Sequence, residues 1–477
     1  MRKNLVALLL SISVIALSSC HGLPSDGEAS GAEAPAAWTR DSASQLKKAI
    51  ENRAAHGLDR ISFGIDADPG SVEDDARLTQ AALAFAGALG RGVTDPEKLY
   101  ALYTVPRPNP DLKRGLAIAL ASGKLEQWFE SLAPQDPNYR KLSQQYLALR
   151  ESDGSRTPKI PPPPEPIKAG ARDPRVPAIA RQLIEYDYLA PQALPDRYTP
   201  AMVAGVKKMQ ADYGIKADGV IGSDVIAILN LSDEERARAI AVNMERLRWL
   251  ERSPPPTRID VNLAAARLSY WRDGKIVDIR RVVVGRPDRS TPQLQSPIYR
   301  LVANPTWTVP RSIQEKEIAA KGPAYLTANN MFWKDGWIVQ GSGPKNSLGL
   351  VKFDMKNEHA IYLHDTPAKP LFKLPQRQRS HGCVRVEDAV GFADMLARDN
   401  GILEQWQKAR AGNEEAYVPL PKQLPVRMLY QTVLFDETGD PVLRADPYEW
   451  NDRIAARLGF SPRATYHLKS GEDDLGP

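Results

Sequence analysis

The spacing of apolar residues changes near Thr257, and that change limits which folds the chain can adopt. Before Thr257 the apolar residues recur about every 3.6 positions, the period of an amphipathic helix. One such stripe contains Leu78, Ala81, Ala82, Phe85 and Leu89. After Thr257 apolar and polar residues alternate, as at Ile259, Val261 and Leu263, which is the period of a half-buried strand. The sequence therefore predicts a multidomain α+β protein, helical up to about residue 256 and mostly β from 257 to about 400.

The helical half divides at a proline-rich segment, Pro158–Pro166, which predicts a stiff connector. Residues 41–170 are predicted to form a helical scaffold. In it, Gly57 suits the end of one helix and Ser71 the start of the next. Residues 233–256 are predicted to add a connecting helix to this scaffold.

A compact unit of three helices is predicted from 175 to 232. Thr199 suits a helix N-cap, Pro200 the first helical position, and Gly214 the helix end. A tight turn at 218–222, Asp-Gly-Val-Ile-Gly, leads into the third helix. These residues resemble the peptidoglycan-binding three-helix module. The alternative is a helical hairpin that binds nothing.

The β half contains a strong hairpin signal, Asp273-Gly274, between strand-like runs at 268–271 and 276–284. Residues of about 310–340 are predicted to form an inserted capping subdomain that covers one face of the sheet. Residues 401–477 are predicted to be a C-terminal extension that packs on the β domain. This extension should contain a strand at 426–433 and a helix at 447–458.

The N-terminus carries the signs of an export signal. Arg2 and Lys3 precede a largely apolar run from Leu5 to Leu17, which is too short to span a bilayer core of about 30 Å. Residues 1–19 are therefore predicted to be a signal peptide.

Cys20 ends a run, Leu-Ser-Ser-Cys, that resembles the lipobox of bacterial lipoproteins. The resemblance implies that Cys20 is lipidated and begins the mature chain, followed by a flexible tether over 20–40. It also implies a periplasmic protein with a lipid anchor in a membrane, and His21 at the next position favours the outer membrane. The alternative is an ordinary signal peptide in which the cysteine is coincidental.

Composition narrows the function further. The formal charge of +5 is mild for 477 residues, and no Lys/Arg run or RNA-binding signature supports a nucleic acid as partner. The chain has two cysteines, so lipidation of Cys20 leaves Cys383 without a disulfide partner. In an oxidising compartment such a thiol is either a reactive group or a small buried hydrophobe, and counting alone leaves both open.

The segment from His359 to Glu387 gathers the groups needed for thiol chemistry. It holds Cys383 and, of the six histidines in the chain, His359, His364 and His381. A thiol needs a base or a cationic neighbour to become a nucleophile near neutral pH, and imidazole supplies either. From the residues alone, His364 and His381 are equally suitable. The competing interpretations are a zinc site and a structural loop that merely contains these residues. No Cys-x-x-Cys or His-Glu-x-x-His spacing supports zinc, so no metal or other cofactor is expected.

His364 followed by Ser380-His381-Gly382-Cys383 resembles the YkuD-type L,D-transpeptidase signature. The position two residues after the cysteine is often Asn in that family and is Arg385 here, an expected variant in its large periplasmic branch. Further similar pieces are Asn304–Pro310, Gly343–Gly349, Tyr362–Pro367 and Asn243–Trp249.

The resemblance implies a role for each residue of the motif. Cys383 would be the nucleophile and His364 its general base, with the imidazole oriented by the backbone carbonyl of Asp365. Tyr362 would line the oxyanion region beside the backbone N–H groups of Gly382 and Cys383. His381 would support the motif from behind. The substrate-binding residues implied are Ser380, Arg385, Asn346 and Trp307. For Arg385, contact with a substrate carboxylate and an ion pair with Glu387 both remain open.

The implied reaction joins two tetrapeptide stems of peptidoglycan through a Cys383 thioacyl-enzyme, with release of D-alanine and a direct link between two diaminopimelates (a 3-3 cross-link). Water or a free D-amino acid as acceptor would instead give an L,D-carboxypeptidase, an endopeptidase or an exchange reaction. A non-catalytic wall-tethering lipoprotein is the rival from another class. The implied partners are peptidoglycan stems and, beyond them, cell-wall synthases.

Overall fold

The computed structural model describes residues 38–152, 158–464 and 466. The predicted signal peptide, the lipidation site Cys20 and most of the predicted tether lie outside the described residues. Among the described residues, no helix has both the length and the apolar character needed to cross a membrane.

The N-terminal region is helical, as predicted. Its elements are α1 (Arg40–Glu51), η1 (Asn52–His56), α2 (Val72–Arg91), α3 (Pro96–Leu99), α4 (Leu112–Ser122), α5 (Leu125–Leu132) and α6 (Pro137–Glu151). Ser71 caps α2 by accepting a hydrogen bond from the backbone N–H of Asp74. Gly57 ends η1 in the left-handed conformation with φ of 65°. Both helix ends agree with the sequence prediction.

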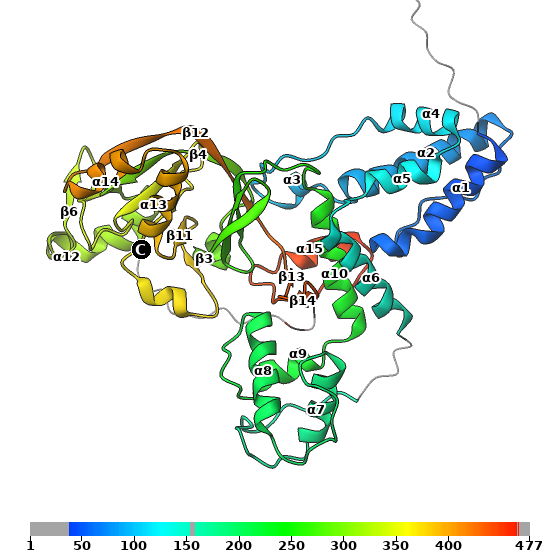
Figure 1. Ribbon diagram of the computed structural model, residues 1–477, viewed down its shortest axis with the longest axis horizontal. Coiled ribbons are helices and arrows are strands. Elements are labelled where there is room, and N and C mark those ends of the chain that lie inside the picture. Colours follow the sequence, from blue (N-terminus) through cyan, green and yellow to red (C-terminus); the bar gives the residue numbers. More distant parts are fainter. Residues whose placement is uncertain (1–37, 153–157, 465, 467–477) are drawn as a thin grey trace, which may run out of the picture. The chain divides into compact units, whose positions relative to one another are not determined.

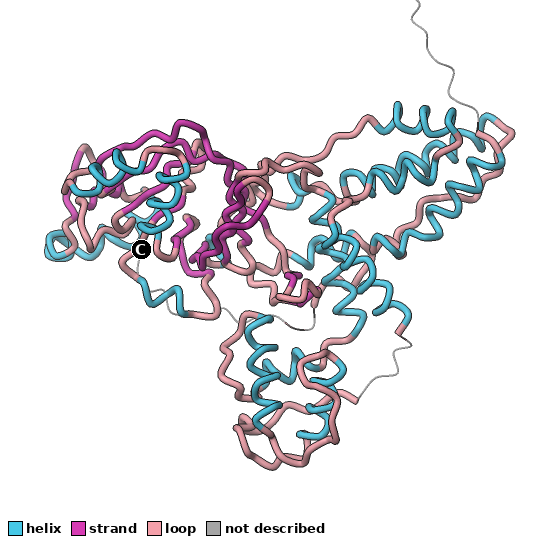
Figure 2. The backbone as a smooth tube through the Cα atoms, viewed as in Figure 1, coloured by secondary structure: helices cyan, strands magenta, loops and turns pink. Residues whose placement is uncertain are grey.

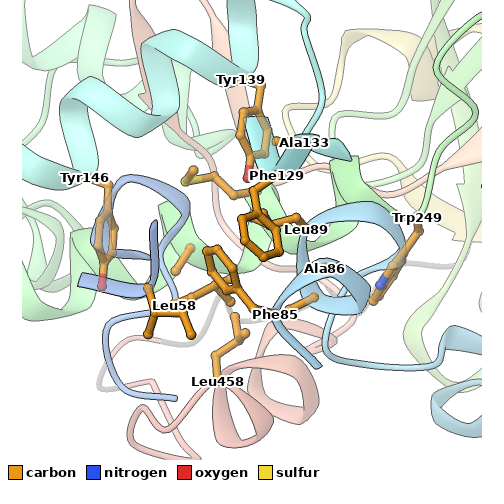
Figure 3. Close-up of a cluster of buried hydrophobic side chains, with 14 of the residues drawn as sticks. Leu58, Phe85, Ala86, Leu89, Phe129, Ala133, Tyr139, Tyr146, Trp249 and Leu458 are labelled. Atoms are coloured by element: carbon orange, nitrogen blue, oxygen red, sulfur yellow. The ribbon is translucent and has the colours of Figure 1, made fainter. Parts of the chain in front are cut away.

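One hydrophobic core joins these helices to α10 (Asp233–Arg248). Within it, the Phe85 and Phe129 rings meet edge to face with centroids 5.1 Å apart, a favoured aromatic geometry. Leu458, at the end of α15 (Asn451–Arg457), belongs to the same cluster (Figure 3). The scaffold core therefore includes residues from near the end of the chain.

A three-helix unit has an apolar core of its own, built from α7 (Val176–Glu185), α8 (Pro200–Tyr213) and α9 (Ser223–Leu229). The predicted cap is present, because Thr199 accepts a hydrogen bond from the backbone N–H of Met202. Gly214 ends α8 with φ of 74°. The connector before this unit contributes Ile160 to its core.

A nine-stranded mixed sheet forms the centre of the β domain, in the order β10-β3-β11-β9-β8-β4-β12-β1-β2, and β3 also pairs with β2. Its strands are the main group of magenta segments in Figure 2. Its strands are β1 (Arg258–Asn262), β2 (Arg267–Arg272), β3 (Lys275–Gly285), β4 (Gln295–Ala303), β8 (Val351–Met355), β9 (Leu363–His364), β10 (Gln378–Ser380), β11 (Val384–Val386) and β12 (Ala416–Leu429). The predicted hairpin joins β2 to β3, with positive φ at both Asp273 and Gly274.

The β domain extends further than predicted. Strand β12 lies between β4 and β1, inside the sheet, so the boundary expected at residue 400 is wrong. Three prolines, Pro419, Pro421 and Pro425, lie within this strand and break its sequence pattern. Its pairing with β4 shifts register between Pro419 and Leu424. The predicted strand at 426–433 is therefore the end of a longer strand that stops at Leu429.

Two helices, α13 (Ala389–Asp399) and α14 (Leu403–Ala411), lie over the sheet (Figure 1). Phe392 of α13 packs in the sheet's core, with its ring 5.6 Å from that of Phe353 on β8. Outside the capping subdomain described next, this half also contains η2 (Pro287–Arg289), η5 (Lys369–Lys373), β13 (Val433–Phe435) and β14 (Pro441–Leu443). Helix α13 follows β11 directly, and because Phe392 of α13 packs in the core of the sheet, the helix helps to hold β11 in place.

A small capping subdomain interrupts the β domain between β4 and β8. It contains α11 (Arg311–Ile313), the π-helical η3 (Gln314–Ile318), η4 (Ala319–Lys321), α12 (Gly322–Ala328) and a three-stranded sheet of β5 (Trp307–Thr308), β7 (Trp337–Gln340) and β6 (Met331–Lys334). Its own cluster of buried residues includes Trp307, Val309 and Ile338. The insertion predicted at about 310–340 is thus a subdomain with its own sheet and core.

Candidate active site

Two short parallel strands, β9 and β11, bring the predicted site residues together. Leu363 lies opposite Val384, and His364 lies opposite Arg385. Leu363 and Val384 belong to the main apolar core of the β domain. Because successive strand residues point to opposite faces of a sheet, His364 and Arg385 face the side away from that core.

Tyr362 and Cys383 precede the two core residues and so join His364 on the same face. The ring centroids of Tyr362 and His364 are 5.6 Å apart. The sulfur of Cys383 accepts hydrogen bonds from the backbone N–H and the side chain of Tyr362, and it lies 3.5 Å from the carbonyl oxygen of Ala360. The residues predicted as nucleophile, base and oxyanion neighbour therefore form one cluster.

The thiol of Cys383 is protonated at rest. Burial of the sulfur raises its pKa above the ordinary value for cysteine. The Tyr362 hydrogen bonds and the charges of Lys352 and Arg385 oppose this shift by stabilising the thiolate. A base must therefore remove the proton as the sulfur attacks.

His364 is a neutral imidazole with a fixed tautomer. Burial lowers its pKa to about 3, and the charge of Arg385 lowers it in addition. Its Nδ1 lies 2.5 Å from the backbone carbonyl oxygen of Asp365. A carbonyl only accepts hydrogen bonds, so Nδ1 carries the proton and Nε2 keeps its lone pair. The orienting contact implied by the family resemblance is present.

The loop before the nucleophile differs in one respect from expectation. The backbone N–H of Gly382 donates to Ser380 Oγ at 3.1 Å, and this hydroxyl donates to the carbonyl of Cys383 at 2.6 Å. The Gly382 N–H is thus committed within the loop, and its expected place in the oxyanion region is wrong. No acceptor in the described part of the chain meets the Cys383 N–H. Ser380 holds the loop.

His381 points toward the capping subdomain. Its Nε2 lies 3.1 Å from Glu317 Oε1 on η3, and the same carboxylate oxygen accepts a hydrogen bond from Arg289 at 2.9 Å. This contact separates the two histidines that the sequence left as equal candidates. His364 lies on β9 beside β11, the strand that begins just after Cys383, and His381 connects the loop to the cap.

Besides Ser380, two more of the expected substrate-binding residues have structural roles instead. Asn346 is 1% exposed, and its amide bonds the backbone of Gln340, Gly341 and Leu348. An amide that is buried and satisfied in this way cannot contact substrate, so that expectation is wrong. Trp307 is also buried, and its indole hydrogen-bonds the side chain of Tyr362. Trp307 therefore orients Tyr362 from the cap.

Lys352 is a site residue that the sequence analysis missed. It lies opposite His364 in the β8–β9 pair, and its Nζ is 4.4 Å from the centre of the Tyr362 ring. It forms an ion pair with Asp354 at 2.6 Å. The only signal was the alternation of Val351, Lys352 and Phe353, a short strand that was not predicted.

Arg385 is the second cation beside the site. It is 3% exposed on the face that carries His364. Glu387, the acidic residue that the sequence offered as its partner, is paired with Arg281 through hydrogen bonds of 2.6 and 2.9 Å. Arg385 and Lys352 thus place two cationic side chains on the face that carries His364, and Lys352 is paired there with Asp354.

Within residues 38–152 and 158–464, no group of three or more His, Cys, Asp or Glu side chains could hold a metal ion.

Comparison with known proteins agrees with this geometry. Residues 256–442 match the family model described as "L,D-transpeptidase catalytic domain", residues 32–145 match "Scaffold domain", and residues 172–229 match "Putative peptidoglycan binding domain". Residues 256–442 therefore form an L,D-transpeptidase catalytic domain of the YkuD type. The chain combines this domain with a peptidoglycan-binding domain.

Individual relatives cover part of the chain. A protein of Haemophilus influenzae named "Putative L,D-transpeptidase" is 30% identical over 243 residues, which are 45% of this chain and 48% of that protein. The chain thus spans about half the length of that curated relative. Solved L,D-transpeptidases from Enterococcus faecium and Stackebrandtia nassauensis each share 13% identity, with TM-scores of 0.22 and 0.25. These alignments cover 37% and 57% of this chain and 50% and 97% of the two solved chains.

Proposed function

We propose that this protein is an L,D-transpeptidase that forms 3-3 cross-links in peptidoglycan through a thioacyl-enzyme on Cys383. The observation that carries the proposal is the shared sheet face of Cys383, Tyr362 and His364, with a neutral, oriented imidazole next to the thiol-bearing strand. A thiol beside an oriented base is the arrangement that nucleophilic acyl transfer requires.

The chemistry follows from the protonation states. The sulfur of Cys383 attacks the carbonyl carbon at the L-centre of diaminopimelate while its proton passes to Nε2 of His364. The oxygen that becomes negative accepts hydrogen bonds from the Cys383 N–H and the Tyr362 hydroxyl. Collapse breaks the bond to D-alanine, whose amine takes the proton from His364. The thioester remains on Cys383.

The second half-reaction reverses these roles. The side-chain amine of another stem attacks the thioester, and its proton returns through His364 to the departing thiolate. The capping subdomain supports amine over water as acceptor, because it places Trp307 against Tyr362 and Glu317 against His381, and a cap at the acyl-enzyme disfavours hydrolysis. The peptidoglycan-binding domain supports a polymeric substrate.

Export and lipidation are part of the proposal. A wall-modifying enzyme must reach the periplasm, and the Leu-Ser-Ser-Cys run at residues 17–20 supports a lipid anchor there. Radiolabelled palmitate should enter the full-length protein, and Cys20→Ala should abolish the label. Equal labelling of the variant would contradict the anchor.

The thioacyl-enzyme can be tested by intact-mass spectrometry. Incubation with a disaccharide-tetrapeptide should add the mass of that whole substrate minus one D-alanine to the wild-type protein. Cys383→Ala should show no adduct, and His381→Gln, which keeps the thiol and His364, should still acylate. A full-sized adduct on Cys383→Ala would overturn the proposed nucleophile.

A further inference from the structure

A buried threonine, Thr291, contacts the loop Ser380–Cys383, which carries the nucleophile. Thr291 is fully buried, and its hydroxyl oxygen accepts a hydrogen bond from the backbone N–H of Gly285 at 2.8 Å. The same hydroxyl donates its single proton to the carbonyl oxygen of Gly382 at 2.7 Å. Thr291 thus ties the end of β3 to the residue just before Cys383.

This bond fixes the peptide between Gly382 and Cys383. Gly382 has φ of 123°, a conformation that glycine adopts easily and other residues rarely adopt. Glycine has many other accessible conformations, so the backbone preference of Gly382 alone does not hold the peptide in one orientation. In a trans peptide the C=O and N–H groups point in opposite directions. Because Thr291 holds the Gly382 carbonyl, the Cys383 N–H points away from Thr291. On that side no acceptor from the described residues meets it.

Tyr448 holds Thr291 in turn. Its hydroxyl donates to the carbonyl of Gly285 at 2.5 Å, and its oxygen accepts a hydrogen bond from the backbone N–H of Thr291. The backbone at Gly285 lies very close to the backbone at Arg289: a Cβ on Gly285 would lie 2.2 Å from the carbonyl oxygen of Arg289. The Tyr448 ring stacks on Tyr430 with centroids 5.4 Å apart. Tyr448 lies outside the residues 256–442 that match the catalytic-domain family.

We propose that Thr291 and Tyr448 are positioning residues for acyl transfer, and that they aim the Cys383 N–H at the oxyanion. The C-terminal segment that carries Tyr448 therefore contributes to catalysis as well as to packing. This inference rests on the proposed acyl-enzyme function. A purely structural role for the two residues is the alternative that the experiment must exclude.

Two reactions of the same thiol separate these roles. Acylation by a carbapenem passes through an oxyanion, whereas alkylation by iodoacetamide is a direct displacement at carbon and needs no oxyanion donor. The full-length variants Thr291→Val, Thr291→Ser and Tyr448→Phe would be compared with wild type in both reactions, with rates followed by intact mass. Thr432→Val, which removes another fully buried threonine hydroxyl, is the matched control.

Thr291→Val should lower the acylation rate about 100-fold, the usual effect of losing one oxyanion donor, and leave alkylation unchanged. Thr291→Ser should restore acylation to within a few-fold of wild type, Tyr448→Phe should lower it less than Thr291→Val, and Thr432→Val should leave it unchanged. The proposal is overturned if Thr291→Val acylates normally, or if it loses both reactions in equal proportion. Wild-type protein that is alkylated but never acylated would instead refute the proposed function.

Discussion

The scaffold and the catalytic domain each bury a network of polar side chains, and the two networks end differently. In the scaffold, Glu245 and Arg248 form a fully buried ion pair at 2.7 Å. Glu245 also accepts from the backbone and hydroxyl of Thr94, and Arg248 donates to Tyr139 and to the carbonyl of His56. Each charge is thus paired and further hydrogen-bonded within the protein.

In the network around Cys383, by contrast, some polar groups have no hydrogen-bond partner among the described residues; we call such a network open and the scaffold network closed. Its described members include the Cys383 N–H, which meets no acceptor among them, and a neutral imidazole with one nitrogen free of a proton. Removing one member of a closed, buried network is strongly destabilising, because the partner's charge is left buried and uncompensated. An open one leaves binding capacity for a substrate. The comparison predicts that mutations in the scaffold network cost stability, while mutations in the catalytic network cost activity.

The largest effect is expected for His364→Gln. Loss of the general base should lower the acylation rate by about 10²–10⁴-fold, the usual contribution of such a group. Stopped-flow acylation by a carbapenem would measure the rate, with thermal unfolding as the stability check. His381→Gln is the control and should lose far less activity. Equal losses in the two variants would remove the distinction between the histidines.

Glu245→Gln should have the largest effect on stability. It leaves the Arg248 charge buried without a counter-charge, which typically costs about 3–5 kcal/mol. Urea unfolding would measure the loss, and the activity of the folded fraction should stay unchanged. The control is Glu234→Gln, which breaks a partly exposed pair with Arg60 and should cost less than about 1 kcal/mol. Comparable costs in both variants would contradict the account of a closed, buried network.

Lys352→Met should have a moderate effect. Removing this cation should lower kcat/KM for a carboxylate-bearing stem about tenfold, or roughly 1.4 kcal/mol. Lys352 holds the pKa of Cys383 down, so its loss should raise that pKa and move the alkylation profile to higher pH. Lys352→Arg keeps the charge and should restore most of both. An unchanged profile in Lys352→Met would show that the charge does not act on the thiol.

The smallest effect concerns pH and compares the two regions directly. Burial lowers the pKa of His56 in the scaffold to about 4 and that of His364 to about 3. In the unfolded chain each histidine takes up a proton near pH 6.5, whereas in the folded protein it stays neutral down to its lowered pKa. The contribution of each neutral histidine to folding stability is therefore complete above about pH 6.5. The contribution falls as the pH drops from about 6.5 toward those lower values, by about 1 kcal/mol per histidine between pH 7.5 and 5.5.

Urea midpoints measured across this range should fall less steeply in His56→Gln and in His364→Gln than in wild type. The acylation rate should change only in His364→Gln. A slope that neither substitution alters would mean that other groups control the pH dependence.

Local signals predicted much of the fold. Thr199, Ser71 and the Asp273-Gly274 turn act through backbone geometry within a few residues, so the sequence specifies them directly. Strand β12 was misplaced because its prolines obscure the pattern, and its position inside the sheet depends on distant partners. Such long-range pairing leaves no trace in a local window.

The candidate site shows the same division. Cys383 and His364 were found through a short motif, but the motif could not distinguish His364 from His381, because that difference lies in Glu317 on the cap. Asn346 was misassigned since its burial is set by a loop fold. Lys352 and Thr291 were missed because only the register of the sheet and a loop crossing bring them to the site.

The central claim is acyl transfer from one stem peptide to another through Cys383. It is tested most directly by mass spectrometry of the products formed when purified full-length protein meets a tetrapeptide stem donor and an isotopically labelled acceptor stem. Wild type should release D-alanine and form a dimer in which two diaminopimelates are joined directly, and Cys383→Ala should form none. Release of D-alanine without any dimer, or dimers formed by Cys383→Ala, would contradict the account.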